Sequence, residues 1–149
     1  MSRDGFYERP NEIHVDRERR VLSYKGARSR PVSGVPFHTP PWSLMQDRLP
    51  LELEMIPEPR NPWDVSAVAL DFEGQRIGYL PAELAPAWQP YVTAMRNEGA
   101  AIFLPAAIRH CDRVDVRVPG RRILAQLAES AGLGLIDTRP RMTRVYYLK

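Results

Sequence analysis

The chain has 149 residues, of which 44% are hydrophobic and 26% are charged, and its formal net charge is +3. A chain of this length and composition can bury a core and is ordinary for a globular protein. No apolar run approaches the roughly 20 residues that a membrane-spanning helix needs, and the polar first ten residues lack the apolar stretch of a secretory signal. The single cysteine, Cys111, excludes an internal disulfide and a cysteine-built zinc site. We therefore expect a cytoplasmic protein.

The charge is distributed unevenly. Residues 1–31 hold 8 basic and 5 acidic side chains, residues 32–105 hold 4 and 9, and residues 106–149 hold 9 and 4. If the two basic ends met in space, they would form a face that attracts phosphates. The alternative is that these arginines are solvated surface.

Fifteen prolines favour short strands and turns over long helices. Near the N-terminus we expect short strands at 12–15 and 21–24 around a charged turn at 16–20. A basic connector at 25–31 follows.

Residues 32–38 are a candidate strand that enters a stiff proline-rich loop at 39–42. Residues 51–56 alternate apolar and acidic side chains, as a half-buried strand does, with the apolar members at 51, 53 and 55 facing the core. Residues 67–72 and 75–80 flank Glu73-Gly74 and predict a hairpin.

Two helices are predicted, at 82–98 and at 120–131. One face of the first carries Leu84, Trp88, Tyr91, Val92 and Met95. Pro90 predicts a kink or a break in this helix, and Gly99 suits its C-terminal end. Further strands are expected at 101–108, 113–118 and 143–148. Together these elements predict a mostly β domain of the α+β class, with about two helices and a small, partly open barrel similar to an OB-fold.

The turn Asn61-Pro62-Trp63-Asp64 carries the most distinctive chemistry. Pro62 fixes its own φ and biases Asn61 toward an extended shape, so the next two residues would be held rigidly. An aromatic ring stacks on any base, which contributes about 1–3 kcal/mol per base. A carboxylate accepts a hydrogen bond from a free 3′-hydroxyl. The alternative is that Trp63 fills the core and Asp64 caps a turn.

The motif order resembles the HIRAN domain, a small β-rich module found beside helicases and as a stand-alone protein. The resemblance spans about 32–108 and rests on Glu58-Pro59, the turn 61–64, the small apolar strand after it, and Gly78-Tyr79-Leu80-Pro81. It implies a module that grips single-stranded DNA or DNA 3′ ends in repair or replication. The expected location is the cytoplasm, including the nucleoid. The family's aromatic-Asp pair, usually with tyrosine, would fall on Trp63 and Asp64.

The chain departs from the family at the strand before this block. The usual basic-aromatic pair is replaced by Pro36 and Phe37, followed by His38. Phe37 keeps a stacking face, whereas Pro36 has no charge to anchor phosphate, so Arg60 and His38 are candidate substitutes. The expected nucleic-acid-binding residues are Phe37, His38, Arg60, Asn61, Trp63, Asp64 and Tyr79.

For some other side chains the sequence allows two interpretations. Trp42 is either a second stacking platform or part of the packing, and Arg113 and Arg117 either contact phosphate or pair with Asp115. The three histidines lack metal-ligand spacing, and the sequence has no phosphate-cradling glycine loop, HExxH or GxSxG. We therefore expect no enzyme activity, no cofactor and no metal.

The predicted organisation is a basic N-terminal extension at 1–31, a HIRAN-like core at 32–118, and a C-terminal helix and strand at 119–149 packed on the core. The alternative function is a protein-interaction module for a separately encoded helicase or nuclease, which the acidic middle of the chain and the missing basic anchor favour.

Overall fold

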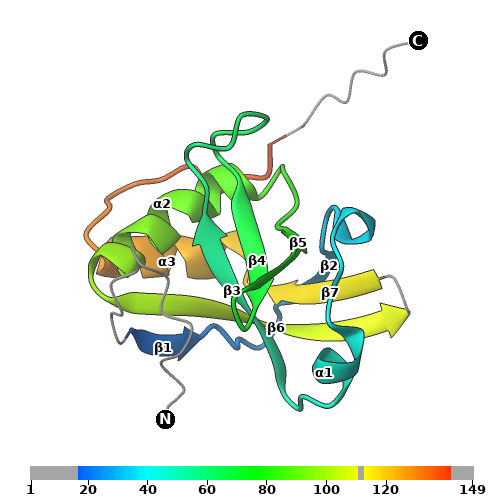
Figure 1. The fold of residues 1–149 in the computed structure, drawn as a ribbon. Coiled ribbons are helices and arrows are strands. Elements are labelled where there is room, and N and C mark those ends of the chain that lie inside the picture. Colours follow the sequence, from blue (N-terminus) through cyan, green and yellow to red (C-terminus); the bar gives the residue numbers. More distant parts are fainter. Residues whose placement is uncertain (1–16, 111–112, 142–149) are drawn as a thin grey trace.

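The computed structural model describes residues 17–110 and 113–141 (Figure 1). The strands in this part of the chain are β1 (Glu18–Val21), β2 (Arg28–Pro31), β3 (Leu51–Pro57), β4 (Val68–Phe72), β5 (Gln75–Tyr79), β6 (Ala100–His110) and β7 (Arg113–Val118). The helices are the 3-10 turn η2 (Val35–Phe37), α1 (Trp42–Gln46), α2 (Ala85–Asn97) and α3 (Arg121–Ser130). None of these helices is long and apolar enough to cross a membrane.

The strands form one curled sheet with the order β2-β7-β6-β3-β4-β5, and β1 pairs in parallel with the start of β6. The other pairs are antiparallel. Just after β2, Ser33 forms a bridge with Tyr79 at the end of β5, through two backbone hydrogen bonds of 2.8 and 2.9 Å. The two ends of the strand order meet at this bridge, here called the seam. The fold is therefore a mostly β, partly open barrel of the OB-fold style, as predicted.

The seam explains the glycine in the Gly78-Tyr79-Leu80-Pro81 motif. A Cβ added at Gly78 would collide with the carbonyl oxygen of Ser33 and would lie 2.6 Å from Cγ1 of Val32. Because backbone atoms cannot move aside without opening the bridge, only glycine allows β5 to approach the segment after β2 this closely.

The core is built by the segments with clear apolar periodicity, and there the predictions are confirmed. β3 buries Leu51, Leu53 and Met55 on one face. The β4–β5 hairpin turns at Glu73-Gly74, where φ is 48° and 84°, the positive values that a tight two-residue hairpin needs. β6, β7 and α3 also form where they were expected.

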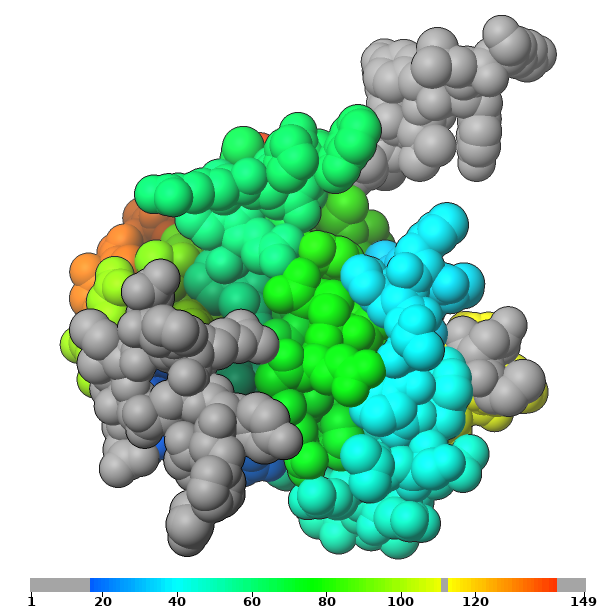
Figure 2. All heavy atoms as spheres, viewed as in Figure 1, coloured from blue at the N-terminus to red at the C-terminus, as the bar shows by residue number. Residues whose placement is uncertain are grey.

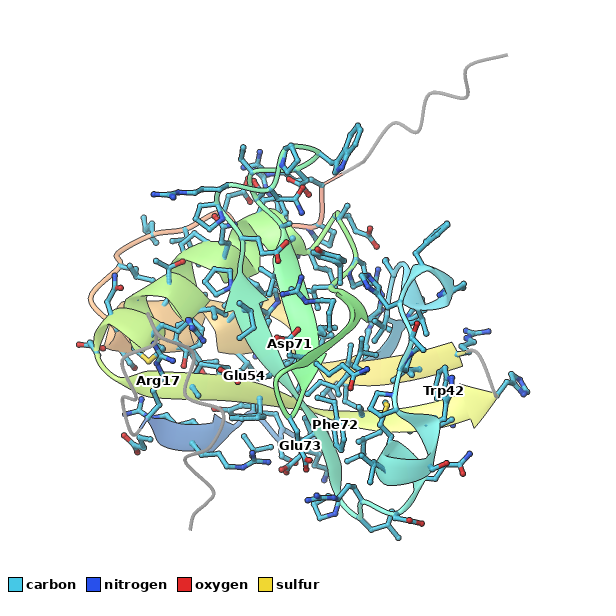
Figure 3. The ribbon with its side chains drawn as sticks, viewed as in Figure 1. Arg17, Trp42, Glu54, Asp71, Phe72 and Glu73 are labelled. Atoms are coloured by element: carbon cyan, nitrogen blue, oxygen red, sulfur yellow. The ribbon has the colours of Figure 1, made fainter. Side chains whose placement is uncertain are left out.

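Two acidic residues face each other on the outside of this sheet. Glu54 of β3 lies directly opposite Asp71 of β4 (Figure 3). Like charges at such a position destabilise a sheet. Each is neutralised, since Arg96 of α2 pairs with Glu54 at 3.0 Å and Arg76 of β5 pairs with Asp71 at 2.6 Å.

Of the kink or break predicted at Pro90, the break does not occur, because α2 runs unbroken from Ala85 to Asn97 with Pro90 inside it. The helix buries Trp88, Tyr91, Val92 and Met95 against the barrel. This packing outweighs the roughly 3 kcal/mol that an interior proline costs. Gly99 follows the helix end with φ 86°, as predicted.

The predictions for the N-terminal third are mostly wrong. The expected charged turn at 16–20 contains most of β1, and the expected connector at 25–31 contains β2. Residues 32–38 form the seam bridge and η2 rather than a continuous strand. Helix α1 begins at Trp42, the last residue of the loop expected at 39–42. β1 and β2 are largely exposed and rich in arginine, so they form by pairing with β6 and β7 and show no apolar alternation.

The expected strands at 12–15 and 143–148 lie outside the described residues. In β7 the valines point inward as predicted, but Asp115, expected to point outward into water, is buried. Arg109 covers it at 3.1 Å and Ser29 donates to it at 3.2 Å.

Candidate nucleic-acid interface

The turn between β3 and β4 is fixed by its own side chains. The Oδ1 atom of Asn61 accepts hydrogen bonds from the backbone N–H groups of Trp63 (2.9 Å) and Asp64 (3.1 Å). An asparagine side chain that bonds to the backbone two and three residues later stabilises such a turn. The turn is therefore held without any contribution from the Trp63 ring.

The Trp63 side chain is 94% exposed, so the reading in which it fills the core is wrong. The Trp63 ring is therefore accessible to a ligand at this turn. The Asp64 carboxylate does cap the turn, since its Oδ1 atom accepts from the Ser66 N–H at 2.8 Å. Within residues 17–110 and 113–141, Oδ2 accepts no protein hydrogen bond.

Helix α2 holds the far side of this turn. The Gln89 side chain donates to the carbonyl oxygens of Val65 and Ala67, both at 2.9 Å. The Glu58 N–H also donates to the Ala67 carbonyl, at 2.9 Å, which closes the base of the turn. The Trp63 ring therefore projects from a turn that is held by α2 and by the backbone hydrogen bond between the end of β3 and the start of β4.

An ion-pair network lies behind the turn. Arg76 of β5 pairs with Glu58 and with Asp71, each at 2.6 Å, and donates to the Tyr79 hydroxyl at 3.1 Å. The other Glu58 oxygen accepts from the Asn61 side chain at 3.0 Å. The network therefore links the turn to Tyr79 through the side chains of Glu58 and Arg76.

The network also sets the ionisation of its members. Burial opposes ionisation of the Glu58 carboxyl, but hydrogen bonds from its neighbours outweigh burial and lower its pKa. Burial and the hydrogen bond to Glu58 raise the pKa of the Tyr79 hydroxyl. At neutral pH the site therefore contains an ionised Glu58 and a neutral Tyr79.

Sequence reasoning missed Arg76 as a supporting residue. The predicted hairpin contained the necessary information, because a two-residue turn at Glu73-Gly74 places Asp71 opposite Arg76. The role of Glu58 could not be predicted from the sequence, because its partner Arg76 is 18 residues away in the chain.

A cavity of about 280 Å³ opens beside the Trp63 ring. It is lined by Ser33, Asn61, Trp63, Asp64, Ala67, Tyr79, Leu80 and Ala82. We call this the turn cavity. The structure therefore brings four of the seven predicted residues to one cavity, and the turn and the seam meet there.

The other three predicted residues lie outside its lining. Phe37 is 90% exposed at the end of η2, which packs against β5, as the cyan and green atoms of Figure 2 show. The His38 ring lies 6.1 Å from the Tyr79 ring. Arg60 is exposed on the turn.

No basic residue of the described chain lines the turn cavity. The cavity therefore offers an aromatic face, a carboxylate and a hydroxyl. Of the other side chains with two readings, Trp42 packs partly buried against the core. Arg113 approaches Asp115 at 3.6 Å, and Arg117 donates to the Ala27 carbonyl at 2.6 Å.

Within residues 17–110 and 113–141, no group of three or more histidine, cysteine or acidic side chains is placed to hold a metal ion.

No protein-family model and no curated protein matches the chain. Among solved structures it is similar to the HIRAN domain of human HLTF, with a TM-score of 0.40 and 17% sequence identity. The match covers 75% of this chain and 93% of that domain. A similarity this low carries no argument about function.

Proposed function

We propose that the chain is a nucleic-acid-binding module of the HIRAN type that holds the 3′ end of single-stranded DNA in the turn cavity, without catalysis. The observation that carries the proposal is the exposed Trp63 ring, fixed beside the Asp64 carboxylate, whose Oδ2 atom accepts no hydrogen bond from the part of the chain that the structure describes. The succession of motifs in residues 57–81 predicts the same function from the sequence.

Each group has a defined task in this proposal. Trp63 stacks on the terminal base, which any base allows because each has a π face. The Oδ2 atom of Asp64 accepts a hydrogen bond from the 3′-hydroxyl. A 3′-phosphate at the same place would be repelled by the carboxylate, so the site selects a free hydroxyl end.

Fluorescence anisotropy with two labelled oligonucleotides, one ending in a 3′-hydroxyl and one in a 3′-phosphate, tests this function. We expect the wild-type protein to prefer the hydroxyl end by about tenfold, which corresponds to about 1.4 kcal/mol. Asp64→Asn keeps an oxygen for the Ser66 N–H but removes the charge, so it should erase most of the preference by improving binding of the 3′-phosphate.

Two further variants complete the design. Trp63→Ala should weaken binding of both oligonucleotides by about tenfold, the loss of one stacked base. Asp47→Asn removes a carboxylate that does not line the turn cavity and should leave the preference unchanged. Equal affinity of the wild-type protein for both ends would refute end capture, and no binding at low salt would refute the nucleic-acid function.

The alternative is a protein-interaction module for a separately encoded helicase or nuclease. The absence of basic residues from the described lining of the turn cavity favours it. In that case Trp63→Ala should abolish capture of a partner in a pull-down treated with nuclease. A partner recovered only when nucleic acid is intact would contradict this alternative.

A further inference from the structure

A second cavity, of about 510 Å³, lies between β2, the end of β7 and the first turns of α2 and α3. It shares no lining residue with the turn cavity. Four arginines contribute to its lining, namely Arg28, Arg30, Arg121 and Arg122. We call it the arginine cavity. Its volume lies within the range of about 300–1,000 Å³ that is typical of small-molecule sites.

The two arginines of β2 point to the inner side of the sheet. In the β2–β7 ladder Arg28 lies opposite Val118 and Arg30 lies opposite Val116, and both valines are buried. Residues directly opposite in an antiparallel pair share a face. Arg28 and Arg30 therefore lie on the face that the valines bury.

Positive charge around this cavity is only partly neutralised. Arg30 forms an ion pair with Glu83. In the described part of the chain, Arg28, Arg121 and Arg122 form no salt bridge within 4.0 Å. Charged groups on the inner face of an edge strand can serve to prevent edge-to-edge pairing, but that role does not require two more arginines from α3 at the same opening.

The rest of the lining is largely apolar. It includes Leu84, Ala87, Trp88, Val118 and Leu124. A guanidinium group presents a planar pair of donors that matches two phosphate oxygens. An apolar wall beside guanidinium groups suits a ligand in which a phosphate is joined to a flat, weakly polar group. A nucleotide is such a ligand, because it carries a phosphate and a base.

We propose that the arginine cavity binds the phosphate of a nucleotide, with the sugar or base against the apolar wall. The phosphate can belong to a free nucleotide or to the strand whose end occupies the turn cavity. The second source is within reach, because Arg30 and Ser33, which line the two cavities, are three residues apart and their Cα atoms lie at most about 11 Å from each other.

Titrations of the ¹⁵N-labelled full chain with dAMP, followed by NMR, and anisotropy with a 12-nucleotide oligo-dT at several salt concentrations test this site. The variant is Arg121→Gln with Arg122→Gln, since both side chains are exposed and their change should not affect folding. The control is Arg20→Gln with Arg48→Gln, which removes the same charge from residues that do not line the arginine cavity.

A free nucleotide is the ligand if dAMP binds the wild-type protein and the control alike and binds the variant at least tenfold more weakly. The strand is the source if dAMP does not bind but the variant lowers the slope of log affinity against log salt by about 1.4. That value is the loss of two phosphate contacts to a single strand. The strand outcome rests on the proposed function, whereas the dAMP outcome does not.

The proposal is overturned if dAMP does not bind and the variant and control show the same salt dependence. If only the proposed function is wrong, the result differs. The wild-type protein then does not bind the oligonucleotide, while dAMP still shifts the amide signals around Arg121 and Arg122.

Discussion

Trp63 stays in water because its neighbours hold the backbone. The Asn61 side chain accepts hydrogen bonds from the backbone N–H groups of Trp63 and Asp64. Pro62, which lies between Asn61 and Trp63, restricts the backbone. Sequence reasoning predicted this rigidity from the residue types alone. It left the direction of the ring open, because burial of an aromatic side chain depends on which elements pack beside the turn.

The lowered pKa of Glu58 makes the turn sensitive to acid. A carboxyl group with a lower pKa in the folded state stabilises the fold above its unfolded pKa of about 4.5, and this contribution is lost as the pH falls through the folded pKa. We expect the free energy of unfolding to fall more steeply below pH 4.5 for the wild-type protein than for Glu58→Gln.

Urea denaturation between pH 7 and pH 3 measures this difference. Glu129→Gln, at an exposed position of α3, serves as the matched control and should follow the wild-type curve. Parallel curves for the wild-type protein and Glu58→Gln would show that the network does not couple the charge of Glu58 to folding.

At the scale of elements, the sequence predicts what apolar periodicity encodes. β3, the hairpin, β6, β7, α2 and α3 all carry a buried stripe, and all were predicted. β1 and β2 were missed because they are short, polar strands whose formation depends on hydrogen bonds to β6 and β7. Such partners are distant in the chain, so no local pattern contains them.

The seam should not tolerate a side chain at Gly78. Gly78→Ala places a methyl group against the Ser33 carbonyl, and overpacking of this kind costs about 1–3 kcal/mol. Chemical denaturation should show this loss. Gly120→Ser is the control, because the added Cβ meets nothing within 4 Å and its hydroxyl can cap α3. A stable Gly78→Ala protein would mean that the seam opens at little cost.

Pro90 offers a test of how α2 is stabilised. Pro90→Ala supplies the missing backbone N–H to the Pro86 carbonyl and removes the ring clash, so we expect a gain of about 1–3 kcal/mol in thermal or urea unfolding. Pro86→Ala is the matched control. Its position in the first turn requires no N–H donor, so it should give no gain. Equal effects would assign the change to the unfolded chain.

At the scale of the whole molecule, the two basic ends of the sequence contribute to one cavity. Arg28 and Arg30 belong to the basic first 31 residues, and Arg121 and Arg122 belong to the basic final 44. From the sequence, a shared basic face could be predicted only if the two ends met in space, because charge counts do not say where the ends of the chain lie. The turn cavity was predicted better, since most of its chemistry is contiguous in sequence, but its Ser33 and Ala82 walls come from the seam and from the turn that precedes α2.

The seam also has a thermodynamic consequence. Ser33 and Tyr79 form the bridge and both line the turn cavity, so a ligand that touches both favours the closed barrel by mass action. At a ligand concentration of about 100 times Kd, hydrogen exchange of these two amides through local opening should slow by about 100-fold. The Val32 amide, bonded to the Val114 carbonyl in the adjoining ladder, gives the comparison and should slow less. If saturating 3′-hydroxyl oligonucleotide left the exchange of Ser33 and Tyr79 unchanged, ligand binding would be independent of barrel closure at the seam. Slowed exchange would mean that ligand binding and barrel closure are coupled in one equilibrium.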